Sequence, residues 1–130
     1  MKELTTGLTG RMERTVTEEN TALAMGSGSL RVFATPALAA LMESAACAAL
    51  ADALPEGQTS VGTVLDLKHT AATPVGMRVW AEAVLNAIDR RALSFTITAY
   101  DECGEIGCAE HTRFLVDAEK FQQKADAKHE

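Results

Sequence analysis

One stretch of the chain limits the possible folds more than any other, because it is apolar over almost its whole length. Residues 36–51 contain only two polar side chains, Glu43 and Ser44, and after the opening proline the rest are Ala, Leu, Met and Cys. Thr35-Pro36 is a typical helix start, since threonine can cap backbone N–H groups and proline fits the first turn. The pattern predicts a helix that runs to about Leu54. A helix that is apolar nearly all round is a buried one.

The rest of the chain predicts strands. Residues 11–18 alternate weakly and contain β-branched side chains, which is typical of a partly exposed strand at or near a sheet edge. After a break at Pro55-Glu56-Gly57, alternating patterns indicate four more strands, at residues 60–70, 77–88, 93–100 and 106–116. Short turn sequences separate them, so we expect consecutive hairpins and antiparallel pairing.

This order of elements describes an α+β protein in which a curved antiparallel sheet wraps one long buried helix. That layout is a hot-dog fold. A chain of 130 residues suits a single domain, here residues 1–130, with residues 118–130 as a peripheral or frayed tail. Residues 24–29, rich in glycine and serine, are expected to form a mobile loop. Because one such sheet leaves an exposed edge, we expect a homodimer in which two sheets join, with a tetramer as the alternative.

Charge and cysteine usage exclude several classes of function. Twelve Lys+Arg against eighteen Asp+Glu give a formal charge of -6, so we predict no nucleic-acid partner. The longest apolar run, residues 45–51, is far shorter than the ~20 residues that cross a bilayer. Residues 1–7 lack the apolar run of a secretory signal, so we expect a cytoplasmic protein with no membrane partner. Three cysteines without a CxxC spacing, and three histidines without ligand spacing, predict reduced thiols, no metal and no cofactor.

Glu43 is the most informative candidate for chemistry. A carboxylate within an apolar helix is costly to bury unpaired, and burial raises the pKa of a carboxyl group by disfavouring its charged form. On a helical wheel Glu43 lies roughly 140° from Leu38 but within about 80° of Thr35, so Thr35 and Glu43 are expected to face one cavity. Two structural alternatives stay open, in which Glu43 lies at the solvent edge of the helix or pairs with an arginine.

Thr35 and His69 are the next candidates. Capping alone explains a threonine before Pro36, although a helix N-terminus also attracts a developing oxyanion. The alternation of residues 60–70 places His69 on the same face as Leu67, toward the helix. An imidazole there can act as a base near neutral pH, or it can be a core histidine bonded to a carbonyl.

Two further positions lie on the predicted strands. Strict alternation places Gly62 with Val64 on the face opposite His69. In the last strand Arg113 shares a face with His111, so its guanidinium can pair with Glu43 or bind an anionic ligand.

Six short blocks between about Arg31 and Phe121 follow one another in an order typical of a known family. They are Val32-Phe33-Ala34-Thr35-Pro36, Leu41-Met42-Glu43-Ser44-Ala45-Ala46-Cys47, Ser60-Val61-Gly62-Thr63, His69-Thr70-Ala71-Ala72-Thr73-Pro74-Val75-Gly76, Asp89-Arg90-Arg91-Ala92-Leu93-Ser94-Phe95 and Glu105-Ile106-Gly107. Together these blocks resemble the fluoroacetyl-CoA thioesterase family of hot-dog proteins. The His-Thr-Ala-Ala-Thr-Pro and Leu-Met-Glu blocks are the most specific of them.

The resemblance implies an acyl-CoA thioesterase and assigns roles to individual residues. In that family a threonine at the helix start, a glutamate on the central helix and a histidine on the following strand form the catalytic group, which implies Thr35, Glu43 and His69. A glycine and an arginine line the substrate site there, which implies Gly62 and Arg113. The member specific for fluoroacetyl-CoA carries phenylalanines before the threonine as a lid. Residues 25–30 of this chain, Met-Gly-Ser-Gly-Ser-Leu, contain no aromatic side chain.

The leading hypothesis is therefore hydrolysis of a short or medium acyl-CoA at a site across a homodimer interface. His69 would deprotonate a water or the Thr35 hydroxyl, and Glu43 would act as the nucleophile or as a base toward water. A second hypothesis is a non-catalytic dimer that binds or senses acyl-CoA. A third is a hydratase or dehydratase. That reaction would need an aspartate or asparagine on the helix, and Glu43 argues against it.

Overall fold

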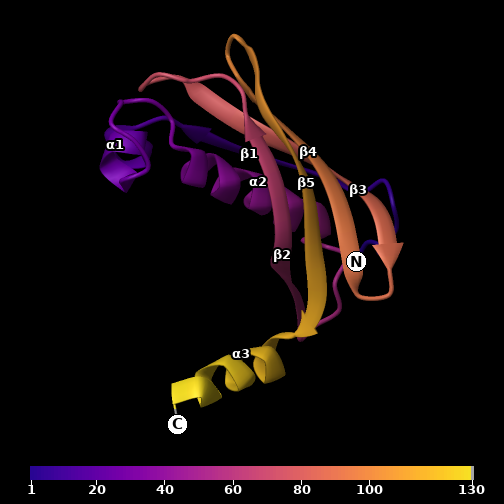
Figure 1. Ribbon diagram of the computed structural model, residues 1–130. Coiled ribbons are helices and arrows are strands. Elements are labelled where there is room, and N and C mark those ends of the chain that lie inside the picture. Colours follow the sequence, from indigo (N-terminus) through magenta and orange to yellow (C-terminus); the bar gives the residue numbers. More distant parts are fainter. Residues whose placement is uncertain (130) are drawn as a thin grey trace.

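The computed structural model describes residues 1–129 and shows one antiparallel sheet of five strands curled around a long helix (Figure 1). The strands are β1 (Thr9–Thr15), β2 (Gln58–His69), β3 (Arg78–Asp89), β4 (Ala92–Asp101) and β5 (Gly104–Asp117). The helices are α1 (Ala22–Met25), α2 (Thr35–Leu50) and α3 (Ala118–Asp126), with single 3-10 turns η1 (Glu18–Asn20) and η2 (Ala127–His129). The predicted α+β layout is present.

The strand order across the sheet is β1-β3-β4-β5-β2, and every pairing is antiparallel. β3, β4 and β5 form consecutive hairpins as predicted, and β1 lies at an edge. β2 does not pair with β3, however, and lies at the opposite edge beside β5. Residues 70–77 are therefore a crossover and not a hairpin turn. The Thr73 hydroxyl fixes this crossover by donating to the Asp101 carboxylate over 2.8 Å.

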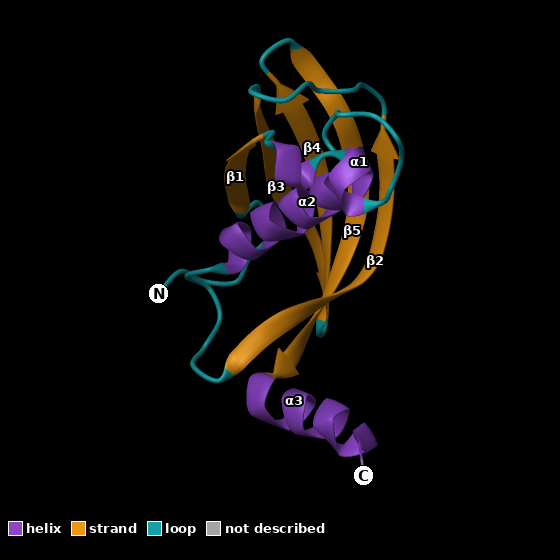
Figure 2. Ribbon diagram, turned by 90° about the vertical axis from the view of Figure 1, so that its left-hand side faces the viewer, coloured by secondary structure: helices purple, strands orange, loops and turns teal. Residues whose placement is uncertain are grey.

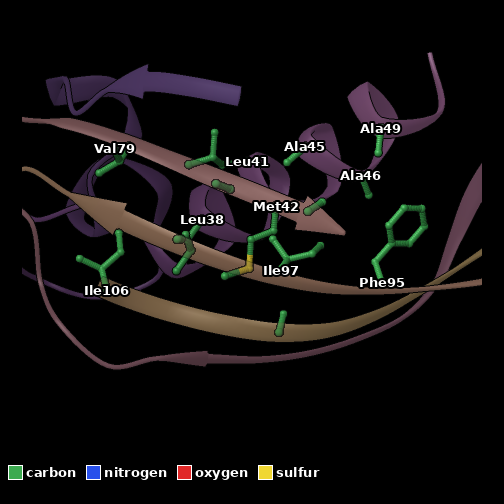
Figure 3. Packing of buried hydrophobic residues seen from close by; sticks show 14 of the residues in the cluster. Leu38, Leu41, Met42, Ala45, Ala46, Ala49, Val79, Phe95, Ile97 and Ile106 are labelled. Atoms are coloured by element: carbon green, nitrogen blue, oxygen red, sulfur yellow. The ribbon is translucent and has the colours of Figure 1, made fainter. Parts of the chain in front are cut away.

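Helix α2 packs against the concave face of the sheet (Figure 2). Its regular part ends at Leu50, four residues before the predicted end, and a short turn follows. The side chains that it buries are Leu38, Leu41, Met42, Ala45, Ala46, Ala49 and Leu50. Figure 3 shows several of them against Phe95 and Ile97 of β4. Full burial of one large apolar side chain stabilises a fold by roughly 1.5–3 kcal/mol, so each leucine that α2 buries contributes substantially to the core.

The outer face of α2 does not fit the expectation of a helix buried all round. Ala40 and Cys47 are exposed in the single chain, because the sheet covers one side of the helix only. Cys47 is thus not a packing residue here. The cysteines at 47, 103 and 108 carry free thiols, as expected.

A β-bulge in β2 changes the face that two site residues occupy. The register against β5 shifts between Gly62 and Val64. Beyond the bulge the predicted alternation holds, and Leu67 and His69 are half-buried while their neighbours are exposed. In the part of β2 before the bulge, residues lie on the face opposite to the one that strict alternation predicted. Gly62 therefore points toward the helix and not away from it. Bulges of this kind often re-aim side chains beside functional sites.

The two remaining segments are short helices. Ala22–Met25 is one helical turn that includes the first two residues of the expected loop, and Gly26 ends it in the left-handed conformation at φ 72°. Residues 26–29 form no regular element, as expected. The tail forms α3, which projects beyond the end of β5 and buries none of its residues (Figure 2). Within residues 1–129, no helix has both the length and the apolar character needed to cross a membrane.

Candidate active site

Thr35 and His69 lie side by side, at the start of α2 and the end of β2. The Thr35 Oγ1 atom is 2.8 Å from His69 Nδ1. The capping role predicted for Thr35 is wrong, because Ala34 is the N-cap and no side chain caps this helix end. Thr35 is the first residue of the helix and its hydroxyl bonds to the imidazole. The pair joins a potential nucleophile to a potential base.

The environment of His69 favours the neutral imidazole. Burial lowers the pKa of His69 below its usual value of 6.5, and the Ala71 backbone opposes this shift only in part. The Nε2 atom is buried and has no hydrogen-bond partner among residues 1–129. Buried polar atoms are rarely left unpaired in a complete structure. The orphaned nitrogen therefore marks a place where a substrate or a second chain would complete the site.

A cavity of about 250 Å³ adjoins this pair. Its walls are mostly small and uncharged, and they come from α1, the segment before α2, and the crossover after β2. The other lining residues are Ala22, Ser27, Val32, Phe33, Thr70, Ala71 and Ala72. An uncharged hollow beside a hydroxyl and an imidazole suits a small apolar group attached to a reactive carbonyl.

A second group of candidate residues lies about two helical turns further along α2. The Glu43 Oε2 atom lies 3.5 Å from Arg113 Nη1. The Arg113 side chain is 7% exposed, whereas that of Glu43 is 44% exposed. The structural alternatives left open for Glu43 both hold in the single chain, because its carboxylate is paired with an arginine and also reaches solvent.

Arg113 is held by neutral partners as well as by Glu43. Its Nε donates to Ser60 Oγ over 2.8 Å and its Nη2 to the Ser60 carbonyl over 3.0 Å. Its Nη1 lies 3.2 Å from Nε2 of His111. Every nitrogen of this buried guanidinium therefore has a contact, and the charge is fixed in one place.

Gly62 faces this group, and any side chain in its place would collide with it. A Cβ at position 62 would lie 2.6 Å from Glu43 Oε2 and 3.3 Å from both Arg113 Nη1 and His111 Cε1. Glycine thus leaves room for the carboxylate beside the strand. Gly62, Glu43 and Arg113 come together from three different elements, β2, α2 and β5.

The single chain does not bring the two groups into one cavity. Thr35 and Glu43 are eight residues apart on α2, which is about 12 Å along the helix axis. The cavity beside Thr35 and His69 does not include Glu43 in its lining. The helical wheel predicted a shared cavity because it gives the angle around the axis and ignores the distance along it.

Sequence reasoning missed Ser60 and His111 as members of the site. Ser60 lies before the bulge, so the alternation of β2 gave no reason to place it inward. His111 shares the strand face of Arg113, and this His-x-Arg spacing was the only signal that it contacts the same group.

Comparison with known proteins places this chain in a family. The model of the fluoroacetyl-CoA-specific thioesterase family matches residues 16–119. The chain belongs to this family. A fluoroacetyl-CoA thioesterase from Streptantibioticus cattleyicolor is 41% identical over 97 residues, which cover 75% of this chain and 70% of that relative. The family resemblance predicted from the six sequence blocks is thus confirmed.

Solved structures agree with this assignment. A structure of the fluoroacetyl-CoA thioesterase, 32% identical, matches with a TM-score of 0.90 over 98% of both chains. A hypothetical protein of the thioesterase superfamily from Thermus thermophilus has the same fold, with a TM-score of 0.90 over 99% of this chain and 96% of that one, at 24% identity. The predicted hot-dog fold is confirmed. As a member of the fluoroacetyl-CoA-specific thioesterase family, the chain is a thioester hydrolase.

Proposed function

We propose that this thioesterase hydrolyses a short or medium acyl-CoA to the free acid and CoA, with Thr35, Glu43 and His69 as its catalytic group. The observation that carries the proposal is the Thr35–His69 pair, which lies on the wall of an uncharged cavity with the imidazole Nε2 unpaired. Gly62 and Arg113 shape the substrate site around Glu43. The chemistry needs no metal or other cofactor.

The complete site is proposed to form between two copies of the chain. β2 is an edge strand, so its outer side is free to pair with another strand. In an antiparallel pair of two β2 strands, the His69 end of one lies toward the Gly62 end of the other. A homodimer would thereby bring the Thr35–His69 pair of one copy to the Glu43 group of the other. A tetramer would be a pair of such dimers.

The proposed reaction leaves two alternative tasks for Glu43. Glu43 either attacks the thioester carbonyl itself, forming a mixed anhydride, or removes a proton from the attacking water. The carbon–sulfur bond then breaks, and the thiolate of CoA takes up a proton. On the anhydride route, water then hydrolyses the anhydride, which releases the free acid and restores the Glu43 carboxylate. Backbone N–H groups at the start of α2 would stabilise the negative oxygen of the tetrahedral intermediate. His69 would serve as the base for the Thr35 hydroxyl or for water.

Thiol release from a panel of acyl-CoA thioesters tests the function. The panel should span fluoroacetyl-, acetyl-, butyryl-, isobutyryl- and hexanoyl-CoA. We expect turnover of short and medium acyl groups, because the cavity beside Thr35 is small and uncharged. Binding of the thioesters without release above the uncatalysed rate would leave the non-catalytic binding protein and refute hydrolysis.

A single turnover in oxygen-18 water separates the two roles of Glu43. If the carboxylate attacks the thioester and water then attacks the Glu43 carbonyl of the anhydride, label enters the Glu43 side chain, which mass spectrometry of the peptide detects. If the carboxylate activates water, the label enters only the free acid.

Gly62→Ala should reduce turnover about 100-fold while it changes stability little. The added methyl group would meet the flexible end of Glu43 and would displace the carboxylate from its place beside Arg113. Kinetics and thermal melting measure the two effects. Thr59→Ala, at an exposed position of the same strand, is the matched control. Wild-type turnover by the Gly62→Ala protein would show that the position of Glu43 does not matter.

A further inference from the structure

His111 is a buried histidine that the reaction proposed above does not use. Only 2% of its surface is exposed, and its ring packs against Phe95 with centroids 6.1 Å apart. Its Nδ1 atom lies 2.6 Å from the carbonyl oxygen of Val64, the residue at which the β2 register resumes after the bulge. A carbonyl only accepts hydrogen bonds, so Nδ1 must carry the proton.

This tautomer decides the role of the other ring nitrogen. In a neutral imidazole with the proton on Nδ1, Nε2 holds a lone pair and accepts hydrogen bonds. Arg113 Nη1 lies 3.2 Å from it, and an arginine nitrogen only donates. Donation therefore runs in one direction, from Arg113 to His111 and from His111 to the Val64 carbonyl. The same Nη1 is the guanidinium atom that lies nearest Glu43 Oε2.

We propose that His111 is a positioning residue, which as a neutral acceptor holds Arg113 Nη1 in the place where it faces Glu43. Ser60 fixes the other two guanidinium nitrogens, so His111 supplies the third anchor. The Ser60 hydroxyl, the Ser60 carbonyl and the His111 imidazole are all neutral, so none of them cancels the charge of the guanidinium. The positive charge of Arg113 thus remains available to Glu43 and to the substrate. The inference rests on the proposed role of Glu43 in thioester hydrolysis.

The charges around the ring agree with a neutral imidazole. Burial lowers the pKa of His111 below 6.5 and the nearby Arg113 charge lowers it further, whereas the Val64 carbonyl and the Glu43 carboxylate act in the opposite direction. Glu43 on α2 and Arg113 on β5 are the charged groups that face the ring, and Phe95 on β4 brings none. A protonated ring would point an N–H group at the guanidinium and lose the contact.

The tautomer can be tested without any assay of activity. Long-range ¹H–¹⁵N spectra of labelled protein at pH 7 should show His111 neutral, with its proton on Nδ1. Removal of the donor in Arg113→Met should shift the Nε2 resonance and leave the proton on Nδ1. A ring that is charged at pH 7, or that carries its proton on Nε2, would overturn the proposal even if the chain hydrolyses thioesters normally.

Two substitutions at position 111 test the effect on catalysis. The glutamine side chain can place an oxygen near the position of Nε2, so His111→Gln keeps an acceptor for Arg113. The asparagine amide instead replaces Nδ1, so His111→Asn keeps only the donor to Val64. We expect kcat/KM to fall about 10-fold in His111→Asn and by less than about threefold in His111→Gln. Thermal melting shows whether the two variants fold equally well.

A double-substitution cycle distinguishes positioning from packing. Without a guanidinium to place, His111→Asn in the Arg113→Met background should change kcat/KM by less than about twofold. Equal losses of kcat/KM in His111→Asn and His111→Gln would indicate a packing role and refute the proposal. So would losses that multiply when His111→Asn and Arg113→Met are combined. If the wild type itself lacks thioesterase activity while the tautomer is as expected, the proposed function fails and the His111–Arg113 contact stands.

Discussion

Replacement of Glu43 by glutamine is expected to lower kcat for acyl-CoA hydrolysis on the order of 10³-fold, because an amide can neither attack the thioester nor take a proton from water. The change is nearly isosteric. Arg113 keeps both of its bonds to Ser60, and the Glu43 side chain is 44% exposed, so the free energy of unfolding should change by less than about 1 kcal/mol. Thiol release under saturating substrate, together with a thermal melt, measures both quantities.

Ser44→Ala is the matched control for Glu43→Gln. Ser44 is the next residue on α2, is half-buried, and donates only to the Leu41 carbonyl within the same helix. It should keep wild-type kcat. A Glu43→Gln protein with more than about a tenth of wild-type kcat would remove Glu43 from the chemistry and leave it a structural partner of Arg113.

Removal of the imidazole in His69→Ala should lower kcat/KM by a comparable factor, about 10³-fold. The pH dependence identifies the imidazole as the source. A base works in its neutral form, and burial lowers the pKa of His69, so the neutral form persists to lower pH than for an exposed histidine. In the wild type, kcat/KM should decline toward low pH with a midpoint below 6.5. The residual activity of His69→Ala should lack this decline.

His129 provides the control for His69. It lies in the exposed turn η2, so His129→Ala should retain both the rate and the pH profile of the wild type. An acid limb that persists unchanged in His69→Ala would belong to another group and would contradict the assignment of His69 as the base.

The parts of the fold that follow from one local rule could be predicted from the sequence. In β4 the alternation predicted a strand at residues 93–100, and the alternate residues Leu93, Phe95, Ile97 and Ala99 are fully buried. The apolar run before residue 51 predicted the central helix. A pattern of two or of 3.6 residues is enough where nothing interrupts it.

The errors arose where an interaction over a long sequence distance decides the outcome. No local signal marks the bulge after Gly62, so the strict alternation assigned Gly62 to the wrong face of the sheet. The pairing of β2 with β5, and not with β3, depends on contacts of the crossover. Thr35 looked like a cap because local statistics favour that role, whereas His69, far along the chain, supplies a better partner for its hydroxyl.

The separation of Glu43, midway along α2, from the Thr35–His69 pair at the start of α2 has a consequence for mixtures of defective proteins. In the proposed arrangement, each active centre takes its imidazole from one subunit and its carboxylate from the other. Chains that lack only Glu43 and chains that lack only His69 would each be inactive alone. When they exchange subunits, every hybrid would contain one intact centre and one doubly defective centre, so the mixture would regain activity by complementation.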